Sequence, residues 1–259
     1  TTNQGDALNG KRPNTIWSNV NLAKKRRTWL FDMGDGCVDR ILGVGPRAID
    51  PEEIDHLFLT HRHADHSWGL ISTLRLINES IMSKYGPNID FPLVRVFAPE
   101  GTTDFVFQML ASTWRLDEFK LKVRIHEFPG SRENLDQKYP QSNTQSSKSN
   151  DRIYDMLPSV ERKPVPISVE PAVKSIIHKP GETKRAALYN LTELIDYENV
   201  IVRAADIQHS VKSYGYTLIQ KSGADSTSKS KKLTILGDTW DPRNATTMAM
   251  DSDVLVHEA

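Results

Sequence analysis

One short segment constrains this chain more than any other: residues 60–66 read Thr-His-Arg-His-Ala-Asp-His. An apolar strand candidate, His56 to Leu59, comes directly before it. A helix candidate, Ser67 to Ile81, comes directly after it, with apolar residues at the spacing of one helix face. The segment is therefore expected at a turn from a strand into a helix.

The spacing within this segment suits metal ligands. Side chains at positions i and i+2 of an extended backbone point the same way, so His61 and His63 can converge on one cation. Asp65 and His66 lie at the turn into the helix and can serve a second cation. Imidazole nitrogen and carboxylate oxygen suit zinc and, less selectively, manganese, iron or cobalt. A polar solvent-exposed loop is the alternative, and such a dense run of ligand-type residues disfavours it.

The rest of the chain alternates strand and helix candidates, which predicts an α/β fold with two sheets and helices outside them. We expect one domain over residues 1–259, with a flexible polar insertion at 129–152. Strands are expected at 15–22, 28–31, 54–60, 91–98, 121–128, 165–178, 200–207, 214–220, 232–236 and 253–256, the first two forming a hairpin. Helices or helical turns are expected at 51–53, 67–81, 101–112 and 188–195.

Composition excludes several classes of protein. The 33 basic residues balance the 33 acidic ones, so any nucleic-acid binding would need a local basic patch. The single cysteine, Cys37, cannot form an internal disulfide, and no apolar run is long enough for a membrane span, so we expect neither a signal peptide nor a membrane-spanning helix. We expect an intracellular protein that has no membrane partner, with the nucleus, mitochondrion and cytoplasm left open.

Four further segments carry a family resemblance when taken together with residues 61–66. They are Phe-Asp-Met-Gly-Asp-Gly at 31–36, His209 to Tyr216, Leu-Gly-Asp-Thr at 236–239 and Val-Leu-Val-His-Glu-Ala at 254–259. In this order they resemble the metallo-β-lactamase superfamily and, within it, ribonuclease Z, the endonuclease that removes the 3′ trailer of precursor tRNA. Asp35 stands where that family usually has Glu, and Ile71 where it has Pro.

The resemblance implies an αββα sandwich with two zinc ions, manganese being possible, at one end of the strands. It implies that His209 joins His61 and His63 at one metal and that Asp238 bridges to a second metal held by Asp65 and His66. Taken alone, His209 could be a polar residue at a strand end and Asp238 could cap a turn. Their functional interpretation depends on the first motif.

Two residues are candidates for proton transfer. Asp65 could accept the proton of the attacking water, and His257 could protonate the leaving 3′ oxygen. The product would be a tRNA with a free 3′ hydroxyl. His257 taken alone could equally be an ordinary core or surface histidine, so its assignment also depends on the first motif.

The resemblance also predicts features that lie outside these 259 residues. The family takes its last metal ligand from a His-Ser-Thr motif beyond position 259, so we expect the domain to be incomplete at its C-terminus. About 140 residues separate His66 from His209, which is typical of the catalytic half of the long eukaryotic type. Expected partners are precursor tRNA and either a second copy of the chain or an N-terminal half.

Two other functions stay open on the sequence alone. A protein of this fold could hydrolyse another phosphodiester or a small substrate, because fold does not fix the substrate. It could also be a non-catalytic scaffold half, although the retained metal motif disfavours that hypothesis. The exact substrate, the native metal and the oligomeric state do not follow from these residues.

Overall fold

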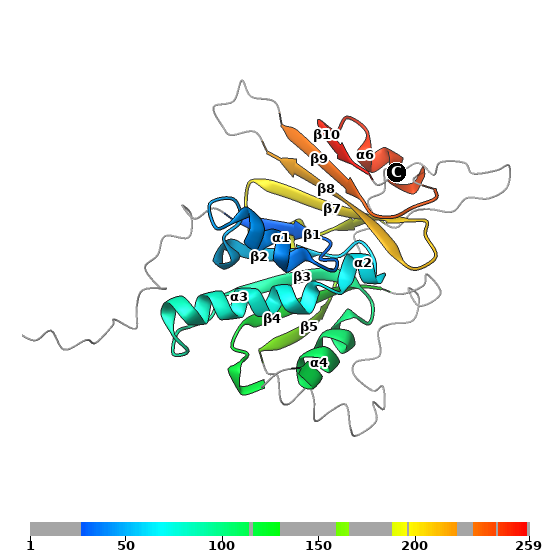
Figure 1. Ribbon diagram of the computed structural model, residues 1–259. Coiled ribbons are helices and arrows are strands. Elements are labelled where there is room, and N and C mark those ends of the chain that lie inside the picture. Colours follow the sequence, from blue (N-terminus) through cyan, green and yellow to red (C-terminus); the bar gives the residue numbers. More distant parts are fainter. Residues whose placement is uncertain are drawn as a thin grey trace, which may run out of the picture.

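A computed structural model describes residues 27–113, 116–129, 159–165, 188–195, 197–221, 230–241 and 243–257. Ten strands in this part of the chain form two five-stranded sheets (Figure 1). The first sheet is parallel throughout and has the order β1 (Thr28–Phe31), β2 (Ile54–Phe58), β3 (Leu93–Pro99), β4 (Lys122–Phe128), β5 (Val160–Pro164). The second has the order β10 (Val254–Val256), β9 (Lys231–Leu236), β8 (Ser213–Gln220), β7 (Val200–Ile207), β6 (Leu188–Asn190).

Helices flank the two sheets. They are α1 (Cys37–Val44), α2 (Ala64–Ser67), α3 (Leu70–Tyr85), α4 (Thr102–Thr113) and α6 (Arg243–Ala249), with short 3-10 turns η2 (Pro51–Glu53), η3 (Leu116–Glu118) and η5 (Thr192–Leu194). Figure 1 shows α3 and α4 on one side of the first sheet and α6 beside the second sheet. The layers therefore run helix, sheet, sheet, helix, as predicted.

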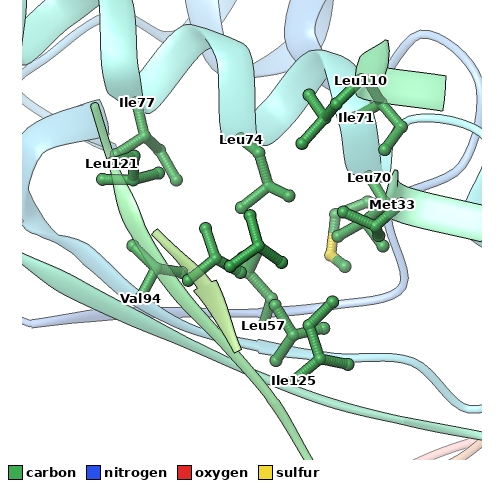
Figure 2. Packing of buried hydrophobic residues seen from close by; sticks show 14 of the residues in the cluster. Met33, Leu57, Leu70, Ile71, Leu74, Ile77, Val94, Leu110, Leu121 and Ile125 are labelled. Atoms are coloured by element: carbon green, nitrogen blue, oxygen red, sulfur yellow. The ribbon is translucent and has the colours of Figure 1, made fainter. Parts of the chain in front are cut away.

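Helix α3 covers the outer face of the first sheet because its apolar residues repeat at helical spacing. Leu70, Leu74, Ile77 and Ile81 are fully buried. Figure 2 shows Leu74 and Ile77 facing apolar side chains of the sheet, among them Leu57 of β2. The helix ends at Tyr85 and is capped by Gly86, whose φ of 80° suits glycine and whose N–H donates to the Met82 carbonyl at 2.9 Å.

Aromatic side chains fill the space between the sheets. Phe58 of β2 stacks on Phe97 of β3, with ring centroids 5.0 Å apart, and meets Tyr216 of β8 edge to face at 5.3 Å. The Tyr216 hydroxyl donates to the Leu59 carbonyl at 2.6 Å and so ties the second sheet to the end of β2. A third cluster, which includes Ile207, Leu236 and Met248, packs α6 on the second sheet.

The structure corrects some of the expected elements. The predicted helix at 67–81 divides into α2 and α3, and 188–195 holds strand β6 before the turn η5. Helices α1 and α6 and strand β5 were not predicted. Strand β1 pairs in parallel with β2, while the first arm of the expected hairpin, 15–22, lies outside the described residues, as do 130–152 of the polar insertion and 166–178 of an expected strand.

Candidate metal centre

The predicted ligand residues lie where the ends of several strands meet. Residues 61–66 follow β2, His209 follows β7 and Asp238 follows β9. The Tyr214 N–H at the start of β8 donates to the Thr60 carbonyl at 2.9 Å, which holds the two sheets together beside the motif. The site is thus built jointly by both sheets.

Glycine permits the close approach of neighbouring loops at this point. A Cβ at position 237 would lie 2.4 Å from the Thr60 Cβ, closer than real Cβ contacts allow. A Cβ at position 34 would lie 1.9 Å from the Asp65 carbonyl oxygen. Gly237 and Gly34 therefore let the loops after β9 and β1 rest directly on the histidine motif.

Three histidines present ring nitrogens to one another. The His63 Nδ1 lies 3.0 Å from the His61 Nε2 and 3.1 Å from the His209 Nε2. Asp238 joins them, with its Oδ2 3.9 Å from the His61 Nε2 and from the His209 Nε2. Ligand atoms of these four residues all lie within 4.8 Å of one another.

A second group shares Asp238. The His66 Nε2 lies 3.2 Å from the Asp238 Oδ1 and 3.6 Å from the Asp65 Oδ2. Ligand atoms of Asp65, His66 and Asp238 also all lie within 4.8 Å of one another. Two groups of donors with one shared carboxylate are therefore present.

Asp32 orients two of these histidines. Its Oδ2 accepts a hydrogen bond from the His66 Nδ1 at 2.8 Å and another from the Thr60 hydroxyl at 2.7 Å. Because that hydroxyl donates to Asp32, it accepts from the His61 Nδ1 at 3.0 Å. Both rings thus keep a proton on Nδ1 and point Nε2 towards the cluster, as metal-bound histidines do. Asp32 lies in the 31–36 motif, but no functional role was predicted for it from the sequence.

The charges around the histidines differ. Burial, reinforced by the neighbouring His66, lowers the pKa of His61 to about 4, so this ring is neutral at neutral pH. The hydrogen bond to Asp32 raises the pKa of His66 to about 9. The carboxylates of Asp32, Asp65 and Asp238 hold positive charge at this second group, which is the position where a cation would be stabilised.

The donor set fits a metal ion. Ligands about 2.0–2.1 Å from a tetrahedral zinc lie roughly 3.3 Å apart, close to the 3.0 and 3.1 Å that separate the His63 Nδ1 from the Nε2 atoms of His61 and His209. Three nitrogens and one carboxylate oxygen are also a common zinc ligand set. His257 belongs to neither group and is exposed. It follows β10, which runs parallel to β9, so His257 and Asp238 both lie beyond the same end of these two strands.

Known proteins resemble this fold and this sequence. No family model matches the chain. Ribonuclease Z of Ligilactobacillus salivarius (strain UCC118) is 28% identical over 236 residues, 90% of this chain and 65% of that protein. Ribonuclease Z of Geobacillus kaustophilus (strain HTA426) is 28% identical over 244 residues, 92% of this chain and 67% of that protein. The chain thus spans about two thirds of the length of these curated relatives.

Solved structures agree with these relatives. The crystal structure of human tRNase Z, short form, aligns with a TM-score of 0.55 and 21% identity, over 90% of this chain and 67% of that one. A long-form RNase Z from yeast aligns with a TM-score of 0.51 and 15% identity, over 91% of this chain and 28% of that one. The chain has the metallo-β-lactamase fold. Among proteins of that fold, it is similar to ribonuclease Z.

Proposed function

We propose that this chain carries the metal centre of an endoribonuclease that cleaves precursor tRNA on the 3′ side and leaves a 3′ hydroxyl. The observation that carries this proposal is the pair of donor groups sharing Asp238, formed by residues from both sheets. The ribonuclease Z relatives support the choice of an RNA phosphodiester as substrate. Among the described residues no helix has both the length and the apolarity needed to cross a membrane.

In this proposal the centre holds two zinc ions. His61, His63 and His209 would hold one, Asp65 and His66 the other, and Asp238 would bridge them. Bound metals supply Lewis-acid polarisation of the phosphate and a water of lowered pKa. The chain's own residues orient this chemistry: Asp32 fixes the tautomers of His61 and His66, and the buried ring of His61 excludes water from its side of the cluster.

Proton transfer is assigned to two residues. The exposed Asp65 carboxylate lies 3.6 Å from the His66 Nε2, at the open side of the cluster, where it would accept the proton of the attacking water. His257 would protonate the leaving 3′ oxygen; its place beyond β10, at the sheet edge shared with β9, supports this role. We also propose that tRNA contacts are shared with a second copy of the chain or with an N-terminal half. Light scattering of the full-length protein with and without precursor tRNA would show whether two copies join in the complex.

Substitution of Asp65 tests the assignment directly. Asp65→Ala removes a proton acceptor and a ligand, so cleavage of a precursor tRNA by the full-length protein should fall by at least about 100-fold. Asp39→Ala, at an exposed carboxylate on α1, is the matched control and should cleave at the wild-type rate. Retained turnover by Asp65→Ala would contradict the mechanism.

The choice of substrate needs its own comparison. Cleavage of a precursor tRNA is measured beside hydrolysis of bis-p-nitrophenyl phosphate by the same wild-type protein. Hydrolysis of the small diester without tRNA cleavage would favour a small-substrate hydrolase. Metal content of less than one ion per chain, with neither substrate cleaved, would favour a scaffold.

A further inference from the structure

A tryptophan lies on the surface beside the histidine cluster. Trp240 comes two residues after Asp238, and 65% of it is exposed to solvent. Tryptophan is highly buried on average in folded proteins, because burial of its large apolar ring is favourable. An indole left in water next to a metal centre therefore suggests that a ligand covers it during function.

The backbone of Trp240 is fixed to the loop that carries His209. The Trp240 N–H donates to the Gln208 carbonyl at 3.1 Å, and the Thr239 hydroxyl donates to the same oxygen at 2.8 Å. The Asp241 N–H donates to the Thr239 hydroxyl at 3.1 Å, and Gln208 forms a β-bridge with Asp241. The indole thus projects from an anchored loop and loses little freedom when a ligand binds.

The ring borders the cluster itself. Its centroid lies 5.5 Å from that of His209, with the two planes inclined by 46°. A group stacked on the exposed indole would therefore lie next to the ligands of the metal centre. A protein partner seated on Trp240 would cover the approach to His209, so a segment of the substrate is the occupant that the geometry favours.

We propose that Trp240 stacks on a nucleobase next to the phosphodiester that the metal centre cleaves. Every base has a π-face, and an exposed aromatic ring on a fixed backbone is how proteins commonly hold single-stranded nucleic acid. The ligand is therefore a single-stranded stretch of RNA at the cleavage position. This inference rests on the proposed endoribonuclease function and adds the residue that positions its substrate.

The test combines a variant with a modified substrate. In the full-length protein, Trp240→Ala should lower kcat/KM for a precursor tRNA by about 5- to 150-fold, the range found when one base-stacking ring is removed. Trp240→Phe should recover most of the loss. Precursors with an abasic nucleotide on either side of the cleaved bond should be poorer substrates for the wild type, and at one of these positions Trp240→Ala should cause no further loss.

Trp68 provides the matched control. It is 66% exposed and follows α2. It lines a hollow with Leu59, Arg62, Ser67, Thr102 and Phe105, none of which belongs to the two donor groups. Trp68→Ala should cleave at the wild-type rate. Metal content of Trp240→Ala is measured as well, because the tryptophan ring contacts His209. The inference is overturned if Trp240→Ala loses metal while Trp240→Phe does not recover activity and the abasic substrates are cleaved as well as the unmodified one.

The outcomes separate this inference from the proposed function. A wild type that cleaves no RNA refutes both. A wild type that cleaves precursor tRNA while Trp240→Ala is equally active refutes the stacking alone. If the loss of kcat/KM caused by Trp240→Ala is the same on every abasic substrate, the stacking is also refuted. It is refuted as well if Trp240→Ala releases a bound partner protein and leaves cleavage unchanged.

Discussion

His126 should make the fold sensitive to acid. Its ring is only 4% exposed, lies between the two sheets and stacks on Phe97 with centroids 4.8 Å apart and planes 11° apart. No hydrogen-bond partner is found within the described residues for either ring nitrogen. Burial, with a smaller effect of Arg124, lowers the pKa of His126 to about 4, against 6.5 for a free histidine. Other charged or titratable side chains that act on it are Arg95, Glu161 and His56.

The size of the effect follows from these two pKa values. Between pH 6.5 and 4 the unfolded chain binds a proton at His126 that the folded chain does not, so the free energy of unfolding falls as the pH falls. At pH 5 the difference is about 2 kcal/mol, and at pH 7.5 it is close to zero. The pH-dependent part of the cost of burying this ring is thus absent at neutral pH and appears in acid.

His126→Phe isolates this contribution, since phenylalanine keeps a flat ring against Phe97 and cannot take up a proton. The free energy of unfolding of the wild type and the variant is measured in urea at pH 7.5 and pH 5. The loss on acidification should be about 2 kcal/mol smaller in the variant. Metal release in acid affects both proteins and cancels in this comparison. An equal loss in both proteins would show that His126 does not remain neutral in the folded state.

Two further substitutions test how the site is held. Asp32→Asn keeps the shape of the side chain but can place an amide N–H against the His66 Nδ1. Zinc affinity, measured by chelator competition, should therefore fall by roughly 10- to 100-fold. Unchanged affinity would argue against the orienting role of Asp32. Gly237→Ala brings a Cβ to 2.4 Å from the Thr60 Cβ. It should therefore destabilise the fold by about 1–3 kcal/mol in thermal melts and lower cleavage about 100-fold. Gly43→Ala is the control: an added Cβ there meets nothing within 4 Å, so this variant should be neutral or slightly stabilising.

The sequence predicted the parts of the fold that have a strong local pattern. The apolar run of β2 and the helical spacing of Leu70, Leu74, Ile77 and Ile81 gave the elements on both sides of the histidine motif. Helix α1 was missed because Leu42 and Val44 are exposed and Gly43 interrupts the pattern. Strand β5 was missed for a related reason: its sequence is Val-Glu-Arg-Lys-Pro, and charge pairs such as that of Glu161 with Arg124 replace apolar contacts.

Prediction of the site from the sequence was limited for a different reason. His61 and His63 could be paired from spacing alone, because i and i+2 side chains share a face of an extended chain. The distance from His63 to His209, 146 positions away, depends on how two sheets pack, and only the resemblance indicated it. Neither the spacing nor the resemblance predicted the role of Asp32, because that role depends on hydrogen bonds through Thr60 that sequence spacing does not specify.

The same contacts predict that folding and metal binding are coupled in this chain. Thr60 accepts a hydrogen bond from the start of β8, donates one to Asp32 and contacts the loop at Gly237, so one residue fixes the relative position of both sheets. The two donor groups draw on both sheets and exist only after those sheets have packed. A metal that binds the folded chain and not the unfolded one would in turn stabilise this packing. Loosening Thr60 or Gly237 should therefore weaken metal binding even though neither residue offers a ligand atom to the cluster.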